Sequence, residues 1–205
     1  MKRLVIDTAT RACSVALFDD SACLAAFHEN IGRGHAERLV PMIAQLPDKG
    51  RADAIYVNVG PGSFTGIRVG ISAARALALA WGALCHGYGC LPLIAAMARG
   101  GAPVAVDTVM TGGHGEVYFQ AFDTSGLPFA PAVSLPLEVA AAKSAGTLVA
   151  GDMADALVAA RGHGTGVSLI PDARAFILIE MQPPVPPTPH YVRGPDAKLP
   201  GGISP

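Results

Sequence analysis

A glycine-rich stretch, Gly60-Pro-Gly-Ser-Phe-Thr-Gly66, constrains the fold of this chain more than any other feature. It separates an apolar, β-branched run at 54–59 from a helical pattern that extends from about Ile67 to Trp81. We therefore predict a strand, a tight turn and a helix in direct succession, with glycines where the backbone needs positive φ. The free backbone N–H groups at the start of that helix would also favour an anion.

Common phosphate and nucleophile motifs do not fit the spacing of this stretch. A Walker A loop needs a lysine after its second glycine, and no lysine follows here. A Rossmann fingerprint needs its third glycine one residue earlier, and a serine-hydrolase elbow needs glycine where Pro61 stands. On chemistry alone, a purely structural turn is as good an interpretation as a binding loop.

The composition is that of a globular chain with a sizeable core. Of its 205 residues, 51% are hydrophobic and 15% charged, which is enough for one large or two small domains. A net charge of −1 without a run of Lys or Arg gives no sign of a nucleic-acid footprint. The four cysteines form no Cys-x-x-Cys pair, so we do not expect a zinc knuckle. We expect a reduced, cytoplasmic setting instead.

No targeting or membrane segment is expected. The apolar run Leu4-Val-Ile6 is too short for a signal peptide and ends at Asp7. The helical pattern at 67–81 is short for a bilayer span and is interrupted by Arg68 and Arg75.

The chain begins with three predicted strands at 3–7, 13–18 and 23–28, whose short connections favour an antiparallel meander. The first turn, Asp7-Thr8-Ala-Thr10, places a carboxylate and two hydroxyls at a hairpin tip, where turn capping is the simpler role for Asp7.

A helix is predicted within 32–46, because Leu39, Met42, Ile43 and Leu46 recur at helical spacing. Pro41 inside that pattern suggests a kink or a break. His35 at its start has no second histidine four residues later, so a cap or surface role is favoured over a metal ligand.

The helix at 67–81 carries a stripe of small residues at a spacing of four. Such a stripe lets another backbone approach closely, either within the core or in a second protein. Its members are Gly66, Gly70, Ala74 and Ala78, with bulk beside them from Ile67 and Ile71.

A second unit is predicted after a boundary at 99–103. Its strands are expected at 104–107, 116–122 and 147–150, and its helices at 135–143, 153–161 and 172–181, after a strand at 84–88 and a helix at 91–98. We thus divide the chain into a first lobe at 1–100, a smaller lobe at 101–182 and a proline-rich tail at 183–205 with a flexible end.

Several motifs, in order, resemble the TsaB (YeaZ) family. They are Ile6-Asp-Thr-Ala-Thr10, Cys13-Ser-Val-Ala16, His35-Ala-Glu-Arg-Leu-Val-Pro-Met42, Gly60-Pro-Gly-Ser-Phe-Thr-Gly-Ile-Arg-Val-Gly70, Glu116-Val-Tyr118 and Tyr191-Val-Arg-Gly-Pro-Asp-Ala-Lys198. The resemblance implies an α/β, actin/Hsp70-like (ASKHA) fold of two lobes, each a mixed sheet flanked by helices.

The resemblance also implies a function. The family takes part in making N6-threonylcarbamoyladenosine in tRNA, in bacteria as the non-catalytic partner and activator of the paralogous transferase TsaD, which the ATPase TsaE joins. We expect heterodimerisation with TsaD, contact with tRNA only through partners, no membrane association, and a homodimer when TsaD is absent.

The partner surface is expected on the two N-terminal helices, as in the family. Its residues would be His35, Leu39, Met42, Ile43, Gly66, Ile67, Gly70, Ile71, Ala74 and Ala78. A bulky Gly70→Trp substitution would then block dimerisation.

A non-catalytic role fits the residues present. The His-x-x-x-His metal motif of the catalytic paralogue falls at about Cys90 and Ile94 here, and this pair cannot hold a metal. Two departures from the family stand out: Ala36 replaces a usual serine, and 107–116 is longer than the family's short basic linker and lacks its arginine.

Two alternatives remain open at this point. An ASKHA-type ATPase or phosphotransferase would use Asp7, Thr8 and Thr10 as its first phosphate loop, although that turn lacks glycine. A peptidase is the weaker alternative, because spacing identifies no Ser/His/Asp set. We expect no intrinsic cofactor and no metal, with ATP or ADP at most inside the complex.

Overall fold

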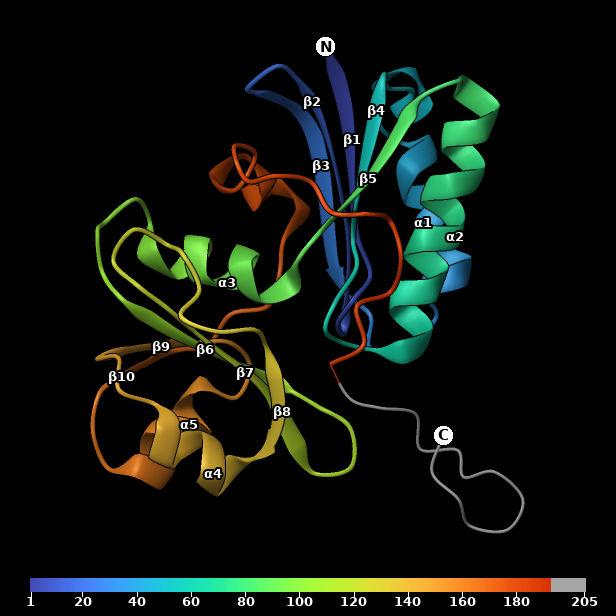
Figure 1. Cartoon of the computed structure of the whole chain (residues 1–205). Coiled ribbons are helices and arrows are strands. Elements are labelled where there is room, and N and C mark those ends of the chain that lie inside the picture. Colours follow the sequence, from blue (N-terminus) through green and yellow to red (C-terminus); the bar gives the residue numbers. More distant parts are fainter. Residues whose placement is uncertain (193–205) are drawn as a thin grey trace, which may run out of the picture.

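The computed structural model describes residues 1–192, and its first lobe is a five-stranded mixed sheet in the order β3-β2-β1-β4-β5 (Figure 1). The antiparallel meander is confirmed, with β4 parallel to β1 and β5 parallel to β4. The strands are β1 Lys2–Asp7, β2 Ala12–Asp19, β3 Ala22–Asn30, β4 Ala54–Asn58 and β5 Leu84–Tyr88.

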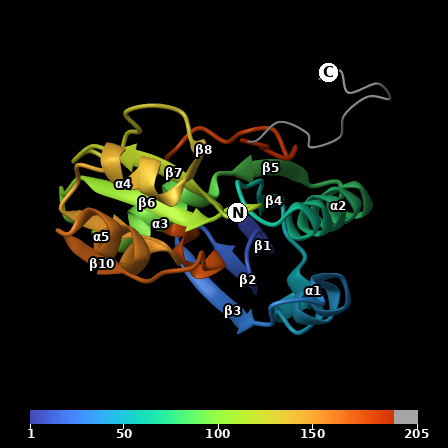
Figure 2. The same cartoon turned by 90° about the horizontal axis from the view of Figure 1, so that it is seen from below.

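Two helices, α1 His35–Ala44 and α2 Phe64–Trp81, cover one face of this sheet (Figure 2). Alternation along β1 explains the arrangement, because Leu4 and Ile6 point to these helices while Val5 points to the opposite face. The break expected at Pro41 does not occur: α1 continues through it, with the proline on the exposed side of the helix. A 3₁₀ turn, η1 Pro47–Gly50, then leads to β4.

The second lobe repeats the topology of the first. Its central strand β6 pairs antiparallel with β7 and parallel with β9, as β1 does with β2 and β4. The elements are β6 Val106–Thr111, β7 Glu116–Phe122, β8 Val133–Pro136, α4 Leu137–Lys143, β9 Leu148–Ala150, α5 Ala154–Arg161 and β10 Thr165–Val167. The sheet order β10-β9-β6-β7-β8 matches the first lobe element for element, so the two-lobed actin/Hsp70-like architecture is confirmed.

Several predicted boundaries need correction. The strand expected at 104–107 begins at Val106 and extends to Thr111, and the helix expected at 135–143 begins only at Leu137, because the preceding residues pair with β7 as β8. The short strand β10 was not predicted. The last predicted helix, 172–181, is a 3₁₀ helix, η2 Ala173–Leu178. Helix α2 begins three residues early because the Ser63 side chain accepts a hydrogen bond from the Gly66 N–H.

The lobes exchange their last helices. Helix α3 Cys90–Arg99 follows β5 but packs Leu91 and Ile94 against the second sheet. Conversely, η2 follows the second sheet but packs Phe176 with Val5 and Phe18 on the first. The predicted lobe boundary at 182 is therefore misplaced, because 173–179 belongs to the core of the first lobe.

The proline-rich tail is not a free linker over its described part. The residues 183–190 cross the open edge of the first sheet as a strap. Val185 and Gly87 exchange backbone hydrogen bonds of 2.7 and 3.0 Å, and the His190 N–H donates to Val59 O at 2.8 Å. The expected flexible end and the motif residues from Arg193 onward lie outside the described residues.

Candidate functional site

The first turn holds a buried carboxylate. Asp7 ends β1 with no exposed surface. Asn58 Nδ2 donates to its Oδ2 at 2.7 Å, the Tyr88 hydroxyl lies 2.9 Å from the same oxygen, and the Ala9 N–H donates to Oδ1 at 3.2 Å. Burial without a cationic partner raises the pKa of Asp7 to about 6, against the hydrogen bonds, which lower it.

The Gly60–Gly66 stretch closes over this turn. The Thr8 hydroxyl donates to Gly66 O at 2.7 Å, and the Ser63 N–H donates to Ala9 O at 2.7 Å. A Cβ at Gly66 would lie 2.0 Å from Thr8 O, and one at Gly62 would lie 2.1 Å from Ala9 O. These glycines are therefore required for a close approach of two backbones, which is the structural interpretation of the motif.

All three residues predicted for a nucleotide phosphate are engaged within the chain. Asp7 and Thr8 are fully buried, and Thr10 Oγ1 accepts from the Ala12 N–H at 3.3 Å. A phosphate could reach Asp7 or Thr8 only after the glycine stretch had moved away. The turn alone thus presents no open phosphate site.

The ten residues predicted for the partner surface face the interior instead. Each is buried within its own chain, and of the ten only Leu39 also lines a surface groove. The small-residue stripe exists to fit α2 onto the first sheet: a Cβ at Gly70 would lie 2.4 Å from the Thr8 hydroxyl and 3.3 Å from Val57. Gly70→Trp would disrupt the fold and says nothing about a surface. The ten residues found buried are His35, Leu39, Met42, Ile43, Gly66, Ile67, Gly70, Ile71, Ala74 and Ala78.

The surface or cap role favoured for His35 is also wrong. Only 8% of this residue is exposed, and its Nε2 lies 3.1 Å from Ala12 O. His35 therefore joins the first turn of α1 to the start of β2.

The outward sides of α1 and α2 form an apolar groove of about 510 Å³, which we call the α1–α2 groove. Val40 and Phe64 are more than half exposed along it. Its lining residues are Ala36, Leu39, Val40, Phe64, Thr65, Arg68, Val69, Ser72 and Ala73. Contiguous exposed apolar surface of this kind is typical of a protein-binding site.

An aromatic clasp stands at one end of the groove. The Arg68 guanidinium lies 3.6 Å from the centre of the Phe64 ring, and its Nε donates to the Tyr191 hydroxyl at 2.8 Å. The Phe64 and Tyr191 rings stack with centroids 5.6 Å apart. Tyr191, which directly follows the strap, is thereby fixed beside the groove.

The described Ser14, Asp172 and His28 lie close together, but they are not arranged as in a serine hydrolase. Ser14 and His28 each lie 3.4 Å from Asp172, on different oxygens, so the carboxylate separates serine from histidine and Ser14 is fully buried. This is not the order of a hydrolase triad, in which histidine contacts serine. Cys90 and Ile94 are both buried in the core, where burial raises the pKa of the Cys90 thiol.

Residues 1–192 contain neither a cluster of metal-ligating side chains nor a helix that could span a membrane. No group of three or more His, Cys, Asp or Glu lies placed to hold a metal ion, and no helix is both long and apolar enough to cross a membrane.

Sequence reasoning missed Asn58 and Tyr88, the partners of Asp7. Asn58 could have been found, because it ends an otherwise apolar strand. A buried amide at such a position needs a polar partner. Tyr88 gave no signal beyond its place at the end of β5.

Known proteins show a consistent likeness. Residues 27–132 match the family model described as TsaD, tRNA N6-adenosine threonylcarbamoyltransferase. Over 84 residues the chain is 44% identical to the Escherichia coli tRNA threonylcarbamoyladenosine biosynthesis protein TsaB, a stretch covering 38% of this chain and 36% of the E. coli protein.

Full-length likeness comes from two further proteins. An uncharacterized Mycobacterium tuberculosis protein, Rv3421c, is 31% identical over 202 residues, covering 95% of this chain and 93% of its own length. The structure of YeaZ from Pseudomonas aeruginosa superposes with a TM-score of 0.77 at 27% identity, covering 93% of this chain and 99% of YeaZ.

Proposed function

Because the chain belongs to the TsaB/YeaZ family of tRNA threonylcarbamoyladenosine biosynthesis proteins, we propose that it is a non-catalytic subunit that binds and activates a TsaD-type transferase. The observation that carries the proposal is the α1–α2 groove, an exposed apolar surface on the two helices where the family resemblance locates the partner. The residues that make contact are its exposed ones, Val40 and Phe64 first, rather than the buried stripe.

The closed first turn supports a role without chemistry of its own. Asp7 and Thr8 lie beneath the glycine stretch and are satisfied by protein atoms, which disfavours the competing role of an ATPase or phosphotransferase. Calorimetric titration with ATP and Mg²⁺ tests that competing role, and tight binding by the chain alone would support it.

The rest of the assembly follows from the same proposal. TsaE joins through the pair, tRNA is held mainly by the partners because this chain has a net charge of −1, and the complex works in the cytoplasm. In the absence of TsaD, two copies of the chain pair through the α1–α2 groove.

A pull-down with the TsaD of the same source tests the surface. Val40→Asp and Phe64→Asp place a charge in the apolar contact and should each reduce retained TsaD by roughly tenfold or more. Leu79→Asp is the matched control, because Leu79 is 87% exposed on α2 but does not line the groove. Equal loss for all three variants, or for none, would move the interface elsewhere.

Reconstitution tests the activity. TsaD, TsaE and tRNA should form threonylcarbamoyladenosine with this chain and much less without it, and Val40→Asp should behave like omission. Full product in the absence of the chain would refute the activator role, even if the pull-down succeeded.

A further inference from the structure

A second cavity, of about 430 Å³, lies between the lobes beneath the strap, and the proposed function does not use it. We call it the strap pocket. The ends of β4 and β5, the start of α3, η2 and the strap surround it, and Gln120 and Ala132 close it from the second lobe. Its volume falls in the range of small-molecule sites in proteins.

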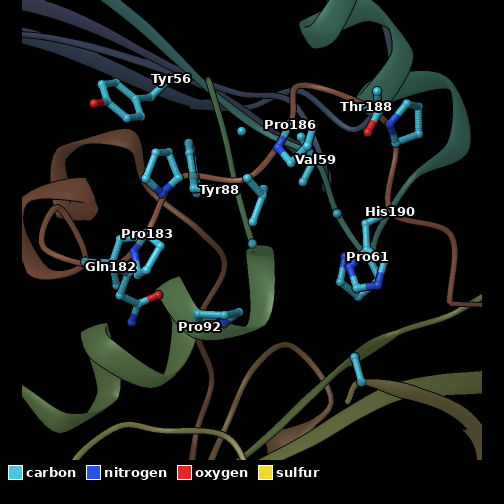
Figure 3. A pocket seen from close by; sticks show the side chains of 18 of the residues that line it. Tyr56, Val59, Pro61, Tyr88, Pro92, Gln182, Pro183, Pro186, Thr188 and His190 are labelled. Carbon is cyan, nitrogen blue, oxygen red and sulfur yellow. The ribbon is translucent and has the colours of Figure 1, made fainter. Parts of the chain in front are cut away.

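The walls are largely apolar and rich in proline and aromatic rings. Figure 3 shows Pro61 and His190 on one side and Pro92, Gln182 and Pro183 on the other. The ring of Phe176 adds an aromatic surface and lies 5.4 Å from the ring of Tyr88 between centroids. Two facing surfaces built from rings suit a planar molecule.

The described residues that line the pocket include one imidazole, of His190, but no acidic side chain and no Lys or Arg. A charged group carried into these walls would lose its hydration without gaining a counterion, which costs several kcal/mol. The pocket is thus built for an uncharged molecule, in contrast to the anionic phosphates that a phosphate loop would bind.

Two glutamine amides supply the polar contacts. Gln120 Nε2 donates to Ala130 O at 3.0 Å, and its Oε1 has no hydrogen bond to another described residue. Gln182 also lines the pocket and is exposed, so its amide is accessible to a bound molecule. An amide presents one donor and one acceptor side by side, so it pairs best with a group that offers the complementary pair.

From these observations we infer that the strap pocket binds an uncharged, planar aromatic molecule that carries an amide-like edge. The rings form the contact surfaces, Gln182 pairs with the polar edge, and the strap holds the molecule in. The inference stands on the pocket alone and is independent of the proposed function.

A matched pair of probes tests the chemistry. 2-Naphthamide and 2-naphthoate share the same rings, but one ends in a neutral amide and the other in a carboxylate. Titration followed by saturation-transfer NMR should give about tenfold or tighter binding for the amide, because the carboxylate is buried without a partner. Equal affinities, or no binding of 2-naphthamide to the unmodified chain, would overturn the inference.

Ala132→Trp fills the pocket from the second lobe and should abolish binding of 2-naphthamide. Ala142→Trp is the control, because Ala142 is exposed on α4 away from the pocket and the added ring should leave binding unchanged. Undiminished binding to Ala132→Trp would place the site elsewhere.

Gln182→Lys provides a test that does not depend on filling the cavity. A cation at the pocket should reverse the preference, so that 2-naphthoate binds more tightly than 2-naphthamide. An unchanged preference would show that Gln182 does not face the probe and would contradict the assignment of the polar edge.

Discussion

The two lobes share one topology, but the buried carboxylates on their central strands, Asp7 on β1 and Asp107 on β6, are stabilised differently. In the first lobe, Asp7 is held by neutral donors, with no cation in contact. In the second lobe, Asp107 lies 3.6 Å from the Arg161 guanidinium and accepts hydrogen bonds from Ser144 and from the Gly146 N–H. A carboxyl group buried in such a sheet can thus be stabilised in two ways. Its pKa can rise so that it holds its proton, or the carboxylate can pair with a cation.

The lobes also differ in what stabilises them. Strands of five to nine residues and the long helix α2 give the first lobe a continuous core on one face of its sheet. Three strands of the second lobe, β8, β9 and β10, have only three or four residues, and its helices have seven and eight. A small lobe with little apolar surface depends more on single polar contacts, and this difference can be tested by substitution.

The largest effect is expected from Arg161→Leu. The Arg161 side chain is 2% exposed, and its guanidinium also donates to Ser144 Oγ and to Gly146 O, so its loss leaves Asp107 buried without a counterion. We expect the free energy of unfolding to fall by about 3–5 kcal/mol in urea titrations. Arg174→Leu is the control: its partner is Asp172, the guanidinium is 60% exposed, and less than about 1 kcal/mol should be lost. Similar losses in both variants would remove the contrast between the lobes.

A pH dependence should distinguish the other carboxylate. The pKa of Asp7 is about 6 in the folded chain and has its ordinary value of 3.8 when unfolded. Between about pH 4 and pH 6 the folded state therefore binds the additional proton, so the free energy of unfolding falls as the pH rises through this window. Above pH 6, ionising the buried Asp7 lowers the free energy of unfolding by its full amount, about 3 kcal/mol.

Asp7→Asn removes that titration. In urea titrations from pH 4 to pH 7, the stability of the unmodified chain relative to the variant should decrease by about 2–3 kcal/mol. Parallel curves for the two proteins would show that Asp7 is ionised in the folded state throughout the range and that the lobes do not differ in this respect.

The smallest of the three effects is expected from Gly66→Ala. The added methyl would meet Thr8 O, so the glycine stretch must shift away from the first turn, at a cost of about 1–3 kcal/mol in unfolding. Ser72→Ala, at an exposed position on the same helix, should change stability by less than about 0.5 kcal/mol. A neutral Gly66→Ala would mean that the close approach is not required.

Periodicity predicted the first lobe well because its elements are long. Strand β5 was predicted at its observed bounds, and α2 was predicted within three residues at its start. Strands of three or four residues leave no readable alternation, so β8 was absorbed into a helix and β10 was missed. The reassignment of η2 to the first lobe depends on tertiary contacts that no local pattern contains.

The partner surface shows a different limit. Helix α2 is apolar on more than one side, with Ala74 inward and Leu79 outward, so hydrophobicity alone did not tell which side meets the sheet. Small residues at a spacing of four were correctly recognised as a site of close backbone approach. For Gly66 and Gly70, the backbone or side chain that comes close is in the Thr8 turn of the same chain.

The exchange of α3 and η2 has a consequence for synthesis on the ribosome. The face of the first sheet that carries Val5 and Phe18 is covered by Leu93 of α3 and by Phe176 and Ile179 of the η2 region, which follow the sheet by more than 80 residues in the sequence. Until η2 has been made, this side of the sheet therefore lacks part of its cover and is open to solvent and to chaperones. A chain that terminates before η2 would leave that part of the surface permanently exposed.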